Sequence, residues 1–255
     1  LTTAEIVALT TDQAQALSTQ QVFALTTSQV ETLETADLVA LTTNAIAALS
    51  SDQIVALRTD QAFALATQQA IALTTAQLVA LETQDFASLS TNSIAALLTS
   101  QVAALSSDEI VALRTDQVFA LKTQQAVALT TDQLLAMETA DFAALSTSAI
   151  AALATYTVSV LSSADIIALS SAQAQAITTG QAYALTTEQV ASMTTAQIAA
   201  IEARDFAAMA VNRMTALTSD QVAALTTAQV KLLSTAQLNG LDTADIPSLG
   251  TAQVQ

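Results

Sequence analysis

Residues 1–25, LTTAEIVALTTDQAQALSTQQVFAL, place a leucine at every eighth position. The same octad runs through all 255 residues without insertion or deletion, so we number its positions as slots 1 to 8, starting at Leu1. Slot 1 is always Leu, Met or Ile, slot 3 is nearly always Thr or Ser, slot 6 is always apolar and slot 8 is usually Ala. A fixed period of this kind is typical of repeat architectures, so the octad decides the fold class.

A longer repeat lies above the octad. LSSDQIVALRTDQAFAL at 49–65 recurs as LSSDEIVALRTDQVFAL at 105–121, seven octads later. We interpret this as duplication of blocks of seven octads. Because seven is odd, octads that alternated between two structural roles would exchange roles in each copy. We therefore expect the octads to be nearly equivalent, each turning the chain by a similar angle.

One continuous helix does not fit the period. Eight helical residues advance by about 800°, so successive leucines would lie about 80° apart and spiral around the helix. A β-solenoid fits no better, because slots 6 and 8 and the leucine that follows break the two-residue alternation of a strand. The chain also has only 3 Gly and 1 Pro to make turns.

One short helix per octad does fit. Thr or Ser in slot 2, followed three residues later by Gln or Glu, is the capping-box pattern, as in Thr10 with Gln13. Where slot 2 holds Glu34, Arg58 or Leu98, we expect the Thr in slot 3 to cap instead. Each helix would run from the Thr pair through slot 8, which is under two turns and too short to be stable alone.

Such helices must stack on neighbouring octads, which is how a solenoid buries its core. The sequence therefore predicts an all-α solenoid of very short capped helices, one per octad. We expect residues 1–255 to form a single continuous array with no internal boundary, cut from a longer array.

The composition argues against several classes of function. The net charge of −16, from 22 acidic and 6 basic residues, would repel nucleic-acid phosphates. No apolar run approaches the roughly 20 residues that span a bilayer. Without Cys or His, the chain has no thiolate, no Ser-His-Asp triad and no zinc site of the usual kind. We expect a protein that is not an enzyme, has no membrane span and binds no nucleic acid.

The acidic residues are placed regularly. Nearly all of them occupy slots 2, 4 or 5, in the first turn of each expected helix, where carboxylates complement the helix dipole. Every acid in slot 2 is accompanied by Asp in slot 5, and two such carboxylates could share a Ca²⁺ ion, although Ca²⁺ takes six to eight oxygen ligands. The candidate metal ligands are these five pairs: Glu34 and Asp37, Glu82 and Asp85, Glu138 and Asp141, Glu202 and Asp205, Asp242 and Asp245.

Four aromatic side chains, Phe23, Phe63, Phe119 and Tyr183, fall in slot 7. Polar residues such as Gln15 also occur there, so we expect slot 7 to be only partly buried. The rings are better suited to lateral packing than to a ligand cage.

The octad resembles the Thr-, Ala- and Gln-rich octapeptide-repeat tracts of giant bacterial secreted or surface-attached, adhesin-like proteins. LTSDQVAAL at 217–225 and LTTAQVKLL at 225–233 carry the resemblance, and the pattern covers the whole chain. The resemblance implies an extracellular or cell-surface fibre, stalk or scaffold that associates with itself end to end or laterally. The alternative is an adhesion module that binds calcium or a partner protein through the repeated acidic pairs; apart from calcium, no cofactor is expected.

Overall fold

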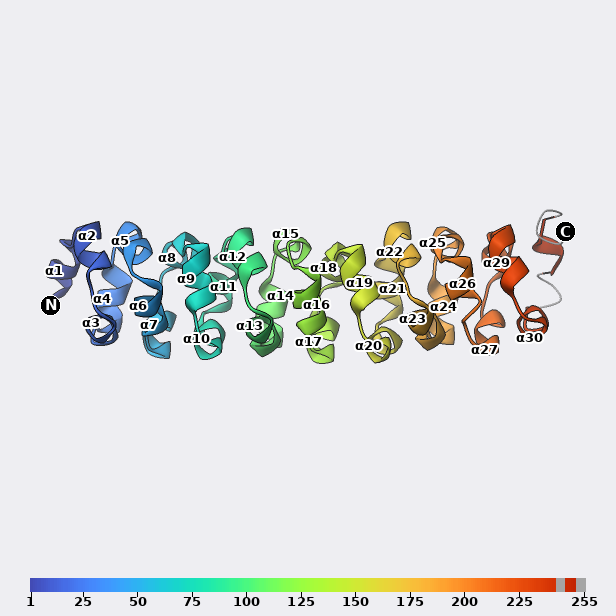
Figure 1. Cartoon of the computed structure of the whole chain (residues 1–255), viewed down its shortest axis with the longest axis horizontal. Coiled ribbons are helices and arrows are strands. Elements are labelled where there is room, and N and C mark those ends of the chain that lie inside the picture. The colour runs from blue at the N-terminus through green and yellow to red at the C-terminus, as the bar shows by residue number, and fades with distance from the viewer. Residues whose placement is uncertain (242–245, 251–255) are drawn as a thin grey trace. The chain divides into compact units, whose positions relative to one another are not determined.

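The computed structural model describes residues 1–241 and 246–250, and each of the first thirty octads, residues 1–240, forms one short helix that begins at slot 3 (Figure 1). No strand occurs in these residues. The prediction of an all-α fold with one helix per octad is confirmed.

Residue contacts divide the chain into two compact units, Leu1–Asp141 and Phe142–Gln255. The first unit contains α1(Thr3–Val7), α2(Thr11–Gln15), α3(Thr19–Phe23), α4(Thr27–Thr32), α5(Thr35–Ala40), α6(Thr43–Ala47), α7(Ser51–Val55), α8(Thr59–Ala64), α9(Thr67–Ala72), α10(Thr75–Ala80), α11(Thr83–Ser88), α12(Thr91–Ala96), α13(Thr99–Ala104), α14(Ser107–Ala112), α15(Thr115–Phe119), α16(Thr123–Ala128) and α17(Thr131–Ala136). The division falls within α18(Thr139–Ala144).

The second unit continues with α19(Thr147–Ala152), α20(Thr155–Val160), α21(Ser163–Ala168), α22(Ser171–Gln175), α23(Thr179–Ala184), α24(Thr187–Ser192), α25(Thr195–Ala200), α26(Ala203–Phe206), α27(Val211–Met214), α28(Ser219–Ala223), α29(Thr227–Leu232), α30(Thr235–Leu238) and the 3₁₀ helix η1(Ile246–Ser248). The octad phase of the sequence is unchanged across the division. A single continuous array over 1–255 stays a prediction.

Two extended residues turn the chain between successive helices. In α17 the N-cap Thr130 has φ −71° and ψ 162°, and the C-cap Met137 has φ −63° and ψ 138°. Both conformations are open to any L-residue. No residue in the described part of the chain has a positive φ. The octad therefore turns without glycine, which explains how the fold forms with so few Gly and Pro residues.

The expectation that slot 3 takes over the cap where slot 2 lacks a hydroxyl is wrong. Arg58 is the N-cap of α8, and Leu98 is the N-cap of α13. The backbone N–H of Arg58 donates to Oε1 of Gln61 at 2.8 Å, and that of Leu98 to Oε1 of Gln101 at 2.7 Å. The glutamine in slot 5 closes its half of the capping box whatever side chain slot 2 carries, so the helix start does not shift.

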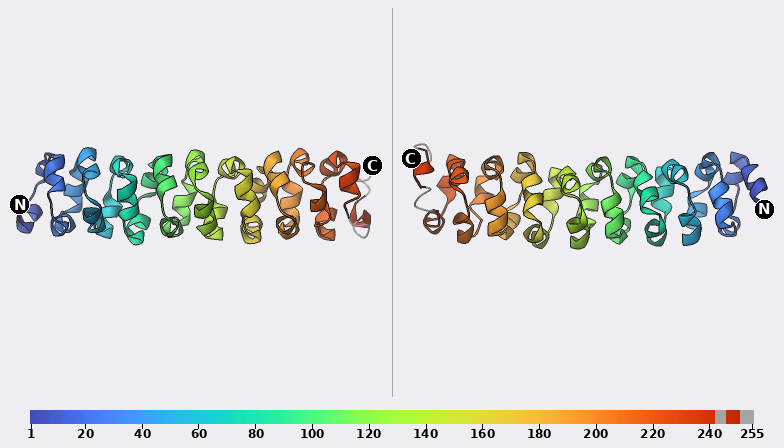
Figure 2. Two further views of the ribbon diagram at one scale, coloured as in Figure 1. Left: turned by 90° about the horizontal axis from the view of Figure 1, so that it is seen from below. Right: turned by 180° about the vertical axis from the view of Figure 1, so that it is seen from behind.

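Each helix packs against the helix three octads away. In the first unit α1 packs on α4, α4 on α7 and α7 on α10, and in the second α19 packs on α22 and α22 on α25. Figure 1 shows α2, α5 and α8 side by side as one such stack. Within each unit successive helices wind around a common axis, which the two further views in Figure 2 also show. The same relation recurs along each unit, as expected for nearly equivalent octads.

The core of each unit is built from slots 6 and 1. Ile54 in slot 6 of α7 is fully buried, and Leu57 in the following slot 1 is 4% exposed. The largest fully buried side chains are the slot-6 residues Phe86, Phe142 and Phe206. Slot 7 points outward, and Phe63 and Phe119 are 65% and 71% exposed. Slots 2 to 4 at each helix start are mostly exposed, whereas slot 5 is mostly buried.

Candidate functional site

The glutamine in slot 5 joins two helices that are four octads apart. In α17 the side-chain oxygen of Gln133 accepts a hydrogen bond from the backbone N–H of Thr130 at 2.7 Å, which closes the capping box. Its Nε2 donates to the carbonyls of Val102 at 3.0 Å and Leu105 at 2.6 Å, at the end of α13. The last carbonyls of a helix have no partner within the helix, so the glutamine supplies one. One buried side chain thus caps the start of one helix and the end of another.

We call this arrangement the glutamine tie. It spans 28 residues, from slot 5 to the slot-1 carbonyl, with Nε2–O distances of 2.6–3.0 Å. The tie is made by Gln53, Gln61, Gln69, Gln77, Gln101, Gln117, Gln125 and Gln133 in the first unit and by Gln173, Gln181, Gln189, Gln197, Gln221, Gln229 and Gln237 in the second. Gln29 likewise donates to the carbonyl of Leu1, 28 residues earlier.

The capping-box pattern in the sequence indicates only the capping half of the tie. The donation by Nε2 to the earlier carbonyls could have been inferred from the preference for Gln over Glu in slot 5. A capping box accepts Glu as readily as Gln, and the helix dipole favours Glu near a helix start. Yet only Glu5 and Glu109 are glutamates in slot 5. The preference for Gln therefore indicates that the amide N–H groups are used.

An arginine can replace the glutamine. Arg213, in slot 5 of α27, donates from Nε to the carbonyl of Leu185 at 2.5 Å, again 28 residues earlier. Arg58 and Arg114 reach the same region from slot 2, and they donate to the carbonyls of Glu31 and Ala87. These basic side chains therefore bind helix ends within the array.

The two acids of each described pair lie in different environments. The slot-2 members Glu34, Glu82, Glu138 and Glu202 are exposed, whereas the slot-5 members Asp37, Asp85, Asp141 and Asp205 are buried. The slot-2 residues Glu34, Glu82 and Glu202 are N-caps whose side chains make no capping bond. The fifth pair, Asp242 and Asp245, lies outside the described residues.

The buried aspartates also differ from one another. Oδ1 of Asp141 accepts a hydrogen bond from Oγ1 of Thr115 at 2.6 Å, and Asp205 accepts from Thr179. Oδ2 of Asp37 is buried without a partner. Burial raises the pKa of the Asp37 carboxyl, and the charge of Glu34 raises it further.

No third acidic ligand joins the four described pairs. Within residues 1–241 and 246–250, no group of three or more His, Cys, Asp or Glu side chains is placed to hold a metal ion. Each described pair thus offers two carboxylates, whereas Ca²⁺ takes six to eight oxygen ligands. Calcium binding by the acidic pairs stays a prediction.

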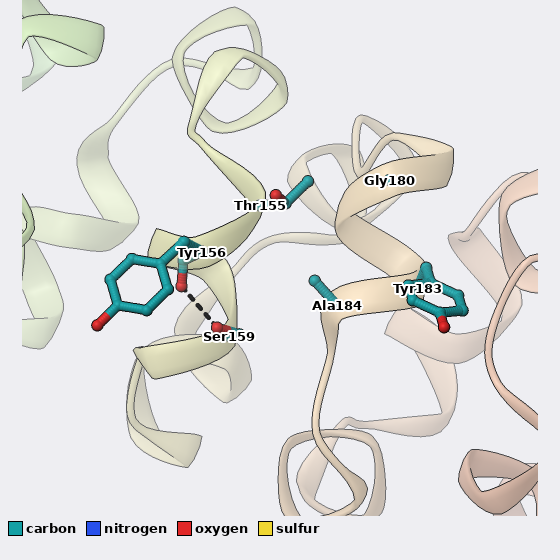
Figure 3. Close-up of a pocket in the computed structure, with 6 residues that line it drawn as sticks. All are labelled: Thr155, Tyr156, Ser159, Gly180, Tyr183 and Ala184. Carbon is teal, nitrogen blue, oxygen red and sulfur yellow. Dashed lines mark hydrogen bonds between the residues drawn. The ribbon is translucent and has the colours of Figure 1, made fainter.

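A shallow surface hollow of about 460 Å³ lies between α20 and α23 (Figure 3). It is lined by Thr155, Tyr156, Ser159, Gly180, Tyr183 and Ala184. Figure 3 shows the two tyrosine rings on opposite sides of the hollow, directed away from one another. The Ser159 hydroxyl donates to the carbonyl of Tyr156 at 2.6 Å. The lining residues present no converging set of reactive groups.

Gly180 allows the two helices to approach at this hollow. A Cβ at this position would lie 3.2 Å from Cγ2 of Thr155, which is a tight contact.

The structure also bears on membrane insertion. In the described stretches of the chain, no helix combines the length and hydrophobicity needed to cross a bilayer.

Comparison with known proteins identifies the repeat. Five segments match the model of the ALTTAQ repeat, at residues 30–67, 78–115, 134–171, 158–195 and 198–235. A comparison with curated proteins gave no match. The hexapeptide ALTTAQ itself stands at 72–77 and 224–229, and its final Gln is the slot-5 residue that makes the tie. Since the matched segments cover more than half of the residues, the chain belongs to the ALTTAQ repeat family.

Proposed function

We propose that this repeat protein is a non-enzymatic structural element, a fibre, stalk or scaffold outside the cell, that associates with itself end to end or laterally. The glutamine tie is the observation that carries the proposal. Each tie links a helix start to a helix end 28 residues earlier, so the same bond pattern extends along each unit with every added octad. Each added octad therefore extends a unit by one more helix that is held in the same way.

The use of the slots supports a structural role. Slots 1 and 6 fill the core, slot 2 caps, and slot 5 ties. Serine and threonine hydroxyls in slot 2 accept bonds from helix-start N–H groups, as Ser50 does from Gln53. The slots that recur are thus used for packing and capping, and the chain contains no His or Cys for nucleophilic catalysis.

Slot 7 supports self-association. In both units it presents exposed apolar side chains, and contiguous exposed apolar surface is typical of interaction sites. The exposed slot-7 residues include Phe23, Val39, Val55, Phe63, Val79, Val111, Phe119, Val127, Leu135, Ile167 and Tyr183. A second copy of the chain presents the same side chains at the same repeat, so lateral contacts between copies can repeat in register. The extracellular location rests on the resemblance to secreted and surface-attached repeat tracts.

Electron microscopy of the concentrated protein, with and without a chelator, tests this proposal. Regular filaments or bundles in both conditions are the expected result, because apolar contacts need no cation. Filaments that form only with Ca²⁺ would instead make the acidic pairs cation sites of an adhesion module. Dispersed monomers in both conditions, checked by sedimentation velocity, would contradict self-association.

A further inference from the structure

Glu109 stands in slot 5, where glutamine is the most frequent residue. Residues 105–117, LSSDEIVALRTDQ, differ from residues 49–61, LSSDQIVALRTDQ, only at slot 5, where Glu109 replaces Gln53. Both side chains are buried, Gln53 at 3% exposure and Glu109 at 2%. The chain thus contains a natural pair of octads that tests what an acid does in the tie.

Gln53 makes the complete tie. Its side-chain oxygen accepts from the backbone N–H of Ser50 at 2.7 Å, and its Nε2 donates to the carbonyls of Val22 at 3.1 Å and Leu25 at 2.6 Å. The amide therefore uses an acceptor on one side and a donor on the other.

Glu109 makes only the capping half. Its Oε2 accepts from the backbone N–H of Ser106 at 2.6 Å and lies 2.9 Å from Oγ of the same residue. Its Oε1 is buried and has no hydrogen-bond partner. Because Oε2 takes the capping place, Oε1 takes the place that Nε2 has in glutamine. The carbonyls in register there, 28 and 31 residues earlier, are those of Leu81 and Leu78 at the end of α10.

An ionised carboxylate cannot make this contact, because it only accepts hydrogen bonds. A neutral carboxylic acid keeps an acceptor oxygen for Ser106 and gains an O–H that can donate to a carbonyl, as the glutamine amide does. We propose that Glu109 closes the tie between α14 and α10 as a neutral carboxylic acid, and that its ionisation opens this one tie. Octad 14 is then a pH-sensitive joint in the first unit, where the other ties are made by glutamine amides, which do not titrate.

The charges around Glu109 favour the neutral form. The titratable groups on the packed neighbours of α14 are Asp85 on α11, with Glu82 at its N-cap, and Asp132 on α17. Helix α10 carries none, and α14 itself adds Asp108. No Lys or Arg lies on these four helices, and Arg114 at the next N-cap is paired with Asp116 at 3.0 Å.

Burial raises the pKa of Glu109, the bonds from Ser106 oppose that shift, and the charge of Asp108 adds to it. The folded state therefore holds the proton more tightly than the unfolded chain. The contribution of this tie to stability is present below the ordinary glutamate pKa of about 4.3 and is lost as the pH rises through the raised pKa.

Two reciprocal variants test the joint. Glu109→Gln installs the amide of octad 7, and Gln53→Glu installs the acid of octad 14 in the same sequence context. We expect the thermal midpoint of the natural chain to fall relative to Glu109→Gln as the pH rises from about 4.5, until Glu109 is fully ionised. Gln53→Glu should lower the thermal midpoint further as the pH rises, because it adds a second tie that ionisation opens. The ¹³C carboxyl signal of Glu109, assigned by its absence in Glu109→Gln, should titrate above the signals of the exposed glutamates.

Glu5→Gln is the matched control. Glu5 is also in slot 5 and also accepts from an N-cap, but its side chain is exposed, and the bonds from Thr2 lower the pKa of its carboxyl. The effect of this substitution on the thermal midpoint should not vary above pH 5. A constant difference between Glu109→Gln and the natural chain from pH 5 to pH 8, or a Glu109 signal that titrates with the exposed glutamates, would overturn the proposal.

Discussion

At the scale of the residue, slot 5 has the strictest side-chain requirements in the octad. Its side chain must be long enough to reach the N-cap and the helix end of an earlier octad at once, and it must both accept and donate. Gln meets these conditions without placing a charge in the core. Asp in the same slot is one carbon shorter, and in Asp37 one carboxylate oxygen is left without a partner. The repeat therefore favours the amide for its two-sided chemistry.

Replacement of a tie glutamine should weaken the fold measurably. Gln133→Leu removes three hydrogen bonds and leaves carbonyls of Val102 and Leu105 without this donor. At about 1 kcal/mol for each bond, we expect a loss of about 2–4 kcal/mol in the free energy of unfolding, measured by urea denaturation. Gln13→Leu is the control, because Gln13 makes the same capping bond but is exposed, and it should cost about 1 kcal/mol or less. Equal losses in the two variants would contradict the role assigned to the tie.

At the scale of the element, no helix is long enough to hold itself together. The helices have four to six residues, as in α26, α1 and α10, whereas isolated helices shorter than about 12 residues are marginal in water. Caps supply partners for the first N–H groups, and burial of slots 6 and 1 supplies the driving force. A helix in this protein therefore exists only in contact with its neighbours three octads away.

Substitutions at two adjacent residues of α10 distinguish the effect of burial from the effect of helix propensity. Leu78 in slot 6 is fully buried, and Val79 in slot 7 is 46% exposed. We expect Leu78→Ala to reduce the free energy of unfolding by about 2–5 kcal/mol, because it leaves a cavity in the core. Val79→Ala should change it by about 0.5 kcal/mol or less. Circular dichroism during thermal and urea unfolding would check both values, and a comparable loss for Val79→Ala would show that slot 7 is not an outer position.

At the scale of the whole molecule, the ties repeat with every octad and are compatible with the duplication seen in the sequence. Each helix packs on the helix three octads away, and each tie glutamine bonds to the end of the helix four octads earlier. The two residues that the bond joins are 28 positions apart in the sequence, or three and a half octads. Seven octads, or 56 residues, are twice this spacing. The segments at 49–65 and 105–121, which both lie in the first unit, are seven octads apart. A block of seven octads can be duplicated there without disturbing the register of the ties.

Charge should oppose the proposed self-association. With a net charge of −16, copies of the chain repel one another at low ionic strength, and screening shortens this repulsion to a few ångströms at about 1 M salt. We expect the assembled fraction, measured by sedimentation velocity, to rise between about 0.05 M and 0.5 M NaCl. The variant with Phe23→Ser, Phe63→Ser and Phe119→Ser should assemble less at every salt concentration and keep its helical circular dichroism. Undiminished assembly of this variant would exclude these rings from the contact.

The sequence by itself determined the repeating unit. The eight-residue period, the Thr pair and the apolar slots 1 and 6 specify one capped helix per octad with a buried face, because capping and burial depend on residues a few positions apart. Reliance on the local pattern also explains why the prediction that slot 3 would cap some helices is wrong. In octads such as that of Arg58, the absent hydroxyl suggested a later helix start, whereas Gln61 and the packing of α8 keep the start in place.

Only the tertiary structure decided how the octads meet. The stacking of each helix on the third along, the donation by Gln133 to carbonyls 28 and 31 residues earlier, and the burial of Asp37 beside an exposed Glu34 all depend on the angle through which each octad turns the chain. That angle follows from the backbone dihedrals of slots 1 and 2 and from the volumes of the packed side chains. Small differences in either accumulate over successive octads, so the partners of slot 5 are set by the assembled array and cannot be derived from one repeat.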